Sequence, residues 1–209
     1  SDIPHVKVHD HYIAVHDGED RLDPSVENGL YAVNNERPSR LSRLKAYVQQ
    51  FERFEGRKVL LDSASRYLDV EGFEGMMARV HYHYLREEWE AIRSIALRLQ
   101  PDQWEQLKVM RYDNATAWTN YRMAVALRKG ALDVEADRFF RNALLAAPSI
   151  PEFNTAYASF LLERGEVEAA LEQYAIAHEL HPMETEALNG LGYISLQRGE
   201  LTLSENYLN

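Results

Sequence analysis

Histidines are the residues of this chain best placed to do chemistry, and they cluster near its N-terminus. Four of the eight, His5, His9, His11 and His16, fall within residues 1–35. Neutral imidazoles bind transition metals and ligate haem iron. On spacing alone we favour solvated loop histidines, because no carboxylate–histidine ligand motif accompanies them. The alternative is a metal site, which predicts stoichiometric zinc or nickel binding that is lost when His5, His9 and His11 become Ala.

Motifs of other catalytic chemistries are missing from the sequence. It contains no cysteine, which excludes disulfides, thiolate metal sites, covalent haem attachment and cysteine nucleophiles within these residues. It also lacks a Gly-rich phosphate loop, a Gly-x-Ser-x-Gly elbow and a His-Glu-x-x-His pattern. Carboxylates are abundant, but solvated helices normally carry them. We therefore predict that the chain is not an enzyme.

The composition is that of an acidic globular chain. Its 209 residues are 45% hydrophobic and carry a net charge of −10, so a substantial core is expected. The charge argues against nucleic-acid binding, which relies on Lys and Arg to neutralise phosphates. Apolar runs fall short of the ~20 residues of a membrane helix, which predicts no membrane insertion. Residues 151–209 hold 10 Asp/Glu against 2 Lys/Arg; a basic partner or a merely soluble surface explains this excess.

A repeat of 34 residues runs through the C-terminal half of the chain. Such a period indicates a stack of similar units. Seven pairs of similar residues lie 34 positions apart: Ala136/Ala170, Phe140/Tyr174, Ala143/Ala177, Pro148/Pro182, Tyr157/Leu191, Ala158/Gly192 and Gly165/Gly199. Small residues let two helices approach closely, glycine allows the positive φ of a turn, and proline stops a helix. Each unit is therefore predicted to be a helix, a turn, a second helix and a stop.

The pattern resembles the tetratricopeptide repeat (TPR), in which a small residue, an Ala, an aromatic, an Ala and a Pro recur in this order. The match is strong for 151–184 and good for the incomplete unit 185–209. It is weaker for 117–150, where the turn glycine, Gly130, is one residue out of register with Gly165. The resemblance implies an all-α fold, a right-handed superhelical solenoid of antiparallel helix pairs.

Upstream of residue 117 the period fades, although helical patterning continues. An apolar stripe of helical spacing follows Pro38: Leu41, Leu44, Val48 and Phe51. Four further segments have helical patterns, with Pro101 expected to end one of them: 57–69, 72–86, 87–100 and 102–112. We expect 36–116 to form degenerate helical hairpins of the same solenoid, after an extended, loop-like arm over 1–35.

The TPR resemblance also implies a binding surface. In TPR proteins the second, fifth, ninth and twelfth residues of each first helix line a concave groove. Carried onto this sequence, these positions give the following candidates: Trp118, Tyr121, Arg128, Glu152, Thr155, Ser159, Leu162, Glu186, Asn189 and Tyr193. An aromatic and acidic groove suits a partner protein or peptide with basic and apolar side chains. The expected function is that of a protein–protein interaction scaffold; Trp118 and Tyr121 as core residues between repeats are the alternative.

A second resemblance concerns the arm. Ser1-Asp2-Ile3-Pro4-His5, followed by His9-Asp10-His11-Tyr12-Ile13, is similar to the stretch after the last haem-attachment motif in bacterial multihaem cytochromes c fused to TPRs. It implies that His11, with His5 as a second candidate, donates an axial ligand to a haem c attached before Ser1. No cofactor is expected in residues 1–209 themselves. The alternative function is thus the interaction region of an exported or periplasmic electron-transfer protein.

The last repeat is incomplete in this sequence, which ends at Asn209 partway through an expected second helix. Solenoids usually end in a polar capping helix. Either the units continue or the exposed end stacks on another molecule. Association of copies into a homo-oligomer through this end is therefore one expectation.

Overall fold

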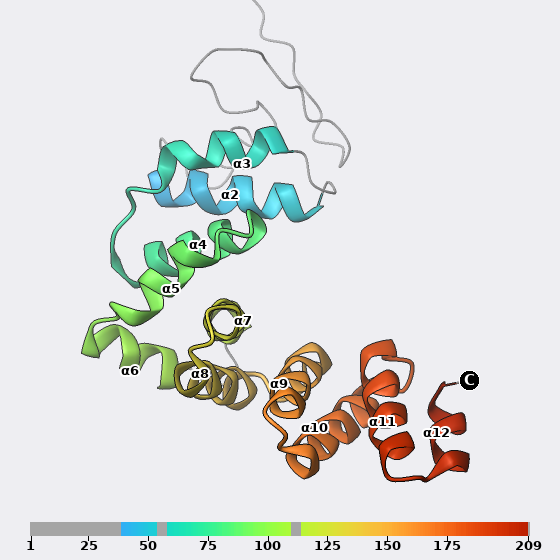
Figure 1. Cartoon of the computed structure of the whole chain (residues 1–209). Coiled ribbons are helices and arrows are strands. Elements are labelled where there is room, and N and C mark those ends of the chain that lie inside the picture. The colour runs from blue at the N-terminus through green and yellow to red at the C-terminus, as the bar shows by residue number, and fades with distance from the viewer. Residues whose placement is uncertain (1–38, 54–57, 110–113, 209) are drawn as a thin grey trace, which may run out of the picture. The chain divides into compact units, whose positions relative to one another are not determined.

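The computed structural model describes residues 39–53, 58–109 and 114–208, and every regular element within these ranges is a helix (Figure 1). The chain divides into two compact units, of which the first ends at Arg86 and the second begins at Glu87. Among the described helices, none has the length and apolar character needed to cross a membrane. The predicted arm, 1–35, lies outside the described residues.

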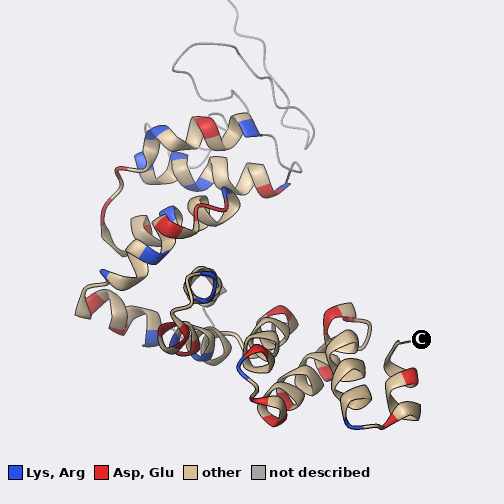
Figure 2. Cartoon of the chain, viewed as in Figure 1, with Lys and Arg blue, Asp and Glu red and all other residues tan. Residues whose placement is uncertain are grey.

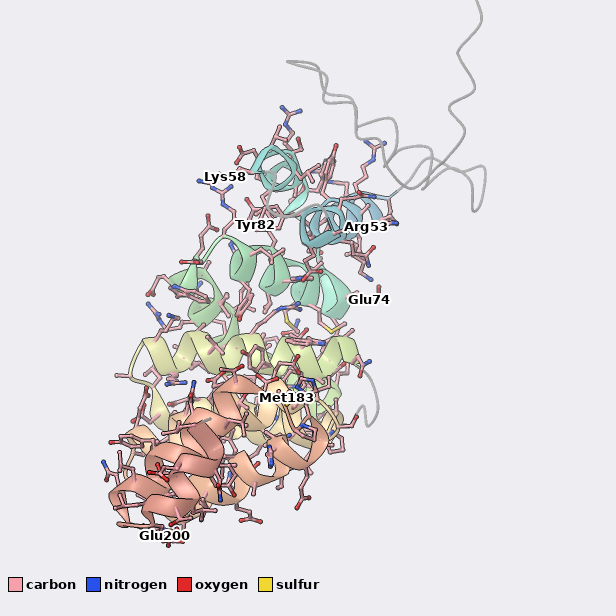
Figure 3. The ribbon with its side chains drawn as sticks, turned by 90° about the vertical axis from the view of Figure 1, so that its right-hand side faces the viewer. Arg53, Lys58, Glu74, Tyr82, Met183 and Glu200 are labelled. Carbon is pink, nitrogen blue, oxygen red and sulfur yellow. The ribbon has the colours of Figure 1, made fainter. Side chains whose placement is uncertain are left out.

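Helical packing around one small core defines the first unit. Its described elements are three α-helices and one 3₁₀ helix: α2 (Arg40–Arg53), α3 (Lys58–Ala64), η1 (Ser65–Tyr67) and α4 (Gly72–Leu85). Leu44, Tyr47 and Val48 recur at helical spacing and bury one face of α2. They share a core with Leu61 and with Tyr82, which Figure 3 labels. The apolar stripe predicted after Pro38 thus forms a core face.

The second unit is a row of helix pairs (Figure 1). Its described helices are α5 (Trp89–Leu97), α6 (Pro101–Val109), α7 (Asn114–Lys129), α8 (Asp133–Ala146), α9 (Pro151–Glu163), α10 (Val167–Leu180), α11 (Thr185–Gln197) and α12 (Leu201–Leu208). Helices α7 and α8, α9 and α10, and α11 and α12 pack as pairs, and each second helix then contacts the first helix of the next pair. The predicted all-α solenoid of paired helices is confirmed.

The repeated small and aromatic residues make the core of this row. Ala136, Phe140 and Ala143 are fully buried on α8, and their equivalents on α10 are buried as well. The packing between pairs is also close, because a Cβ on Gly190 of α11 would collide with the ring of Tyr174 on α10. The aromatic side chain therefore fills the space that the glycine leaves open.

The turns between paired helices keep the 34-residue period. Gly165 and Gly199 have φ values of +77° and +75°, in the left-handed region that favours glycine. In the first pair the equivalent residue is Ala131, with φ +54°, and not Gly130. Gly130 lies one residue out of register, as the sequence indicates, and is not the residue that makes the turn. The backbone keeps the period, and only the residue type departs.

Pro101 begins a helix rather than ending one. Helix α5 ends at Leu97, and Pro101 is the first residue of α6. A proline suits the first turn, where its missing N–H would have no helical partner. The prediction that Pro101 ends a helix is thus wrong. Helix α5 still packs against α7, as the second helix of one pair packs on the next.

Candidate partner-binding surface

One side of α7, α9 and α11 forms a continuous candidate surface. Residues at i+7 and i+11 each lie within about 20° of residue i around a helix. We call the surface formed by three such sets the first-helix face: Trp118, Val125 and Lys129 on α7; Glu152, Ser159 and Glu163 on α9; Glu186, Tyr193 and Gln197 on α11. Figure 1 shows these three helices succeeding one another along the second unit.

Aromatic rings meet where the N-terminal halves of α7 and α9 lie together. Trp118 and Tyr121 contact the buried Phe153, with ring centroids 4.8 and 5.1 Å apart, and contact each other at 5.4 Å. Both are partly buried against the core cluster that contains Phe153. Trp118 and Tyr121 can thus be core residues between repeats and also part of a binding surface, because each ring packs between repeats and keeps part of its surface exposed.

The C-terminal ends of α7 and α9 enclose a cleft. It has a volume of about 410 Å³ and is lined by Val125, Arg128, Lys129 and Glu163. The Arg128 guanidinium donates two hydrogen bonds to the Glu163 carboxylate, one of them 2.9 Å long from Nε. The Lys129 ammonium lies 4.8 Å from the centre of the Trp89 ring. Both cations are therefore held in place by neighbours on other helices.

A hydroxyl network joins α9 to α10, its partner in the same pair, and to α11 of the next pair. Ser159 Oγ donates to Glu186 on α11 at 3.2 Å and lies 2.9 Å from the Tyr174 hydroxyl on α10. Burial raises the pKa of Tyr174, so this phenol stays protonated at neutral pH. Glu186 is held across the α9–α11 boundary by the Ser159 hydroxyl.

The remaining candidates from the sequence differ in accessibility. Tyr193 is 49% exposed and accepts a hydrogen bond from Gln197 Nε2 at 2.6 Å. Asn189 is exposed and Leu162 is half-buried. Thr155 is only 1% exposed, because its hydroxyl turns inward and donates to the Glu152 carbonyl oxygen at 3.1 Å. The structure therefore gathers the other candidates on one side of the first helices and leaves Thr155 inside.

Sequence reasoning missed four residues of this surface. Val125 occupies the ninth position of the repeat that begins at residue 117, so the TPR positions include it. Lys129, Glu163 and Gln197 lie one residue beyond the twelfth position. Their i, i+11 relation to Trp118, Glu152 and Glu186 was the available signal.

Negative charge is concentrated on the helices of the C-terminal pairs, as Figure 2 shows. Glu152 and Glu186 are the acidic residues in the first turns of α9 and α11. Carboxylates there interact favourably with the helix dipole. These residues thus stabilise their own helices and also contribute negative charge to the first-helix face.

Two histidines of the described ranges pair with carboxylates. No group of three His, Cys, Asp or Glu side chains among these residues could hold a metal ion. His81 contacts Glu52 at 2.6 Å, and His181 contacts Glu184 at 3.2 Å. His5 and His11 lie outside the described residues, so haem ligation by the arm stays a prediction.

Comparison with known proteins identifies the class of fold. No protein-family model and no curated protein matches the sequence. Two solved structures of MamA align with a TM-score of 0.60: residues 41 to the end of MamA from Desulfovibrio magneticus RS-1, at 14% identity over 81% of this chain and 92% of that one, and a double mutant, at 13% identity over 81% and 91%. YrrB, described as a TPR protein with an unusual peptide-binding site, aligns with a TM-score of 0.56 at 13% identity over 87% and 89%. The chain has a TPR-like solenoid fold.

Proposed function

We propose that the chain is a protein-interaction scaffold that binds an extended segment of a partner protein along the first-helix face. The observation that carries the proposal is the make-up of this face. It combines apolar side chains that stay in solvent, such as Tyr193 and the neighbouring Leu196 at 49% and 52% exposure, with fixed charges and a cleft. The peptide-binding site named for YrrB supports the same use of the fold.

The face also favours one class of partner. Glu152 and Glu186 would lie against the phosphates of a nucleic acid, which is unfavourable. An extended peptide with basic and apolar side chains would instead meet carboxylates and half-exposed rings. The occupant is therefore a protein segment rather than DNA or RNA.

Selection of peptides tests the proposal. Random peptides about 12 residues long are displayed and selected on the full chain, and binding of the selected peptides is measured by fluorescence anisotropy. The test variant is Tyr193→Ala/Leu196→Ala, which removes an exposed side chain of the face and the exposed apolar side chain beside it on α11. The matched control is Val134→Ala/Leu145→Ala, because these residues are 71% and 61% exposed on α8, a second helix.

We expect the test variant to weaken binding about tenfold, as hot-spot truncation does, and the control to bind like the parent. Circular dichroism confirms that both variants are folded. Selected peptides that bind both variants equally well, or lose affinity only for the control, would overturn the proposal.

A further inference from the structure

We infer that the segment held on this face is bipolar: it carries a basic side chain and, about five residues away, a carboxylate, which bind at opposite ends of the boundary between α7 and α9. This inference rests on the proposed function and specifies the ligand. We call this boundary the α7–α9 seam; its residues are Trp118, Val125, Lys129, Glu152, Ser159 and Glu163.

The N-terminal end of the seam suits a cation. Glu152 is exposed and directly precedes Phe153, whose ring is in contact with Trp118 and Tyr121. These contacts fix the two partly exposed rings at the same end as the carboxylate. A Lys or Arg side chain of a ligand can there pair with Glu152 and pack its apolar stem against the partly exposed rings. The guanidinium of Arg122 already lies 5.6 Å from the centre of the Trp118 ring.

The C-terminal end of the seam suits an anion. The cleft there has two cations, Arg128 and Lys129, against the single carboxylate of Glu163, so its lining has one excess positive charge. Glu163 holds the planar guanidinium of Arg128 in one orientation, and Lys129 is placed against Trp89. A ligand carboxylate that enters the cleft therefore meets cations that are already positioned.

The distance between the two ends sets the spacing of the charges. Glu152 and Glu163 are 11 residues apart on α9, which at 1.5 Å per residue is about 16.5 Å along the helix axis. An extended chain advances about 3.3 Å per residue and covers this length in about five residues. Between the ends lie Val125, which also lines the cleft, and Ser159, whose hydroxyl is bonded to Tyr174 and Glu186.

The neighbouring seam lacks this polarity. Between α9 and α11 the N-terminal end has Glu186, but at the C-terminal end the carboxylate of Glu163 takes the place of Lys129. The neutral Gln197, whose amide is bound to Tyr193, takes the place of Glu163. Of these two seams, the α7–α9 seam is therefore the one that would bind both of the opposite charges on a ligand.

A double-mutant cycle between chain and ligand tests the inference. The probe is the tightest selected peptide that depends on the first-helix face, with its basic residue and its carboxylate each replaced by Ala in turn. Each peptide is titrated with the parent and with Glu152→Lys, Lys129→Glu and the control Glu179→Lys, an equal charge reversal on α10. Amidated and free C-termini are compared, which separates a side-chain carboxylate from a terminal one.

We expect the probe to contain a basic and an acidic group about five residues apart. Removing its basic residue should weaken binding to the parent and to Glu179→Lys about fivefold, and should not weaken binding to Glu152→Lys. Removing its carboxylate should weaken binding about fivefold to the parent, to Glu179→Lys and to Glu152→Lys, but should not weaken binding to Lys129→Glu. Probes without this charge pair, or charge effects equal in all proteins, would overturn the inference and leave the proposed function standing. Failure to obtain any face-dependent peptide would overturn both.

Discussion

Ala131 has the left-handed backbone conformation that Gly165 and Gly199 have in the following repeats. A Cβ makes this conformation costly, by roughly 1–2 kcal/mol per residue. The surrounding turn retains the conformation nevertheless, with Ala131 N–H donating to the Arg128 carbonyl oxygen at 2.9 Å. Strain at this alanine is therefore offset by the packing of α7 on α8.

Replacing Ala131 with Gly should raise the free energy of unfolding by about 1 kcal/mol, because glycine removes the Cβ penalty. The converse change, Gly165→Ala, should lower it by about the same amount. An added Cβ at Gly165 meets nothing within 4 Å, so only the backbone term acts. Urea unfolding followed by circular dichroism measures both. A lower midpoint for Ala131→Gly would show that the turn does not hold strain.

The two turns also show what a sequence reveals about single residues. Gly165 could be predicted, because its residue type and its place in the period agree. Ala131 could not, because alanine has no turn preference and the nearby Gly130 offered a more plausible candidate. Thr155 was misleading for a related reason: its position predicted a groove residue, but nothing in the sequence indicates that its hydroxyl bonds within its own helix.

Between elements, a buried phenol joins α8 to α9. Tyr157 donates to Asp137 Oδ1 at 2.7 Å, and Arg141 Nε donates to the other oxygen of that carboxylate at 2.8 Å. Burial, and then the hydrogen bond to Asp137, raise the pKa of Tyr157 above its ordinary value of 10.0. The phenol therefore keeps its proton in the folded protein at pH values where an unfolded chain loses it.

This shift predicts alkaline destabilisation. Below about pH 10 both states are protonated and the contribution of Tyr157 is complete. Above it the unfolded state releases a proton that the folded state retains, so stability falls by up to about 1.4 kcal/mol per pH unit for this group. Tyr157→Phe should lose about 1 kcal/mol at neutral pH, with the hydrogen bond, and show a shallower decline above pH 10.

Thermal unfolding between about pH 8 and 11 measures this decline. The control is Tyr193→Phe, which removes the hydroxyl of an exposed tyrosine and should keep the slope of the parent. An unchanged slope in Tyr157→Phe would contradict the assignment.

The positions of the helices could be predicted from the sequence where the 34-residue period is strong. The helices from α7 onward could be located because the same residue types recur at the same faces. Helix α6 was expected over 102–112, but its start at Pro101 could not be predicted, because proline is compatible with either end of a helix and nothing upstream repeats at 34 residues. The division after Arg86 has no signal in composition.

For the molecule as a whole, the last helix pair exposes an apolar surface. In the preceding pair the equivalent surface is covered by the pair that follows it. Tyr174 on α10 is 3% exposed beneath α11, whereas its equivalent on α12, Leu208, is 52% exposed. Leu201, on the same helix, is 61% exposed. Such a surface favours association with a further helix or another molecule.

We expect this surface to associate with a second copy at high concentration. Leu201→Glu/Leu208→Glu should lower the sedimentation coefficient of concentrated samples toward that of the monomer, because charges would be buried unpaired. Val134→Glu/Leu145→Glu adds the same charges on α8 and should leave association unchanged. A parent that stays monomeric over the whole range, or a control that dissociates equally, would exclude association through α12. Glu200, which Figure 3 labels, directly precedes this helix.

The fit of Tyr174 over Gly190 has a mechanical consequence. A row of repeats comes apart most readily from its ends, since each unit is stabilised mainly by its neighbours. Drawing α11 away from α10 would uncover a whole aromatic ring in a single step. When tension is applied at the C-terminal end, α12 should therefore detach at low force. The force needed should then rise sharply at the boundary between α10 and α11, so the chain would unfold in discrete steps.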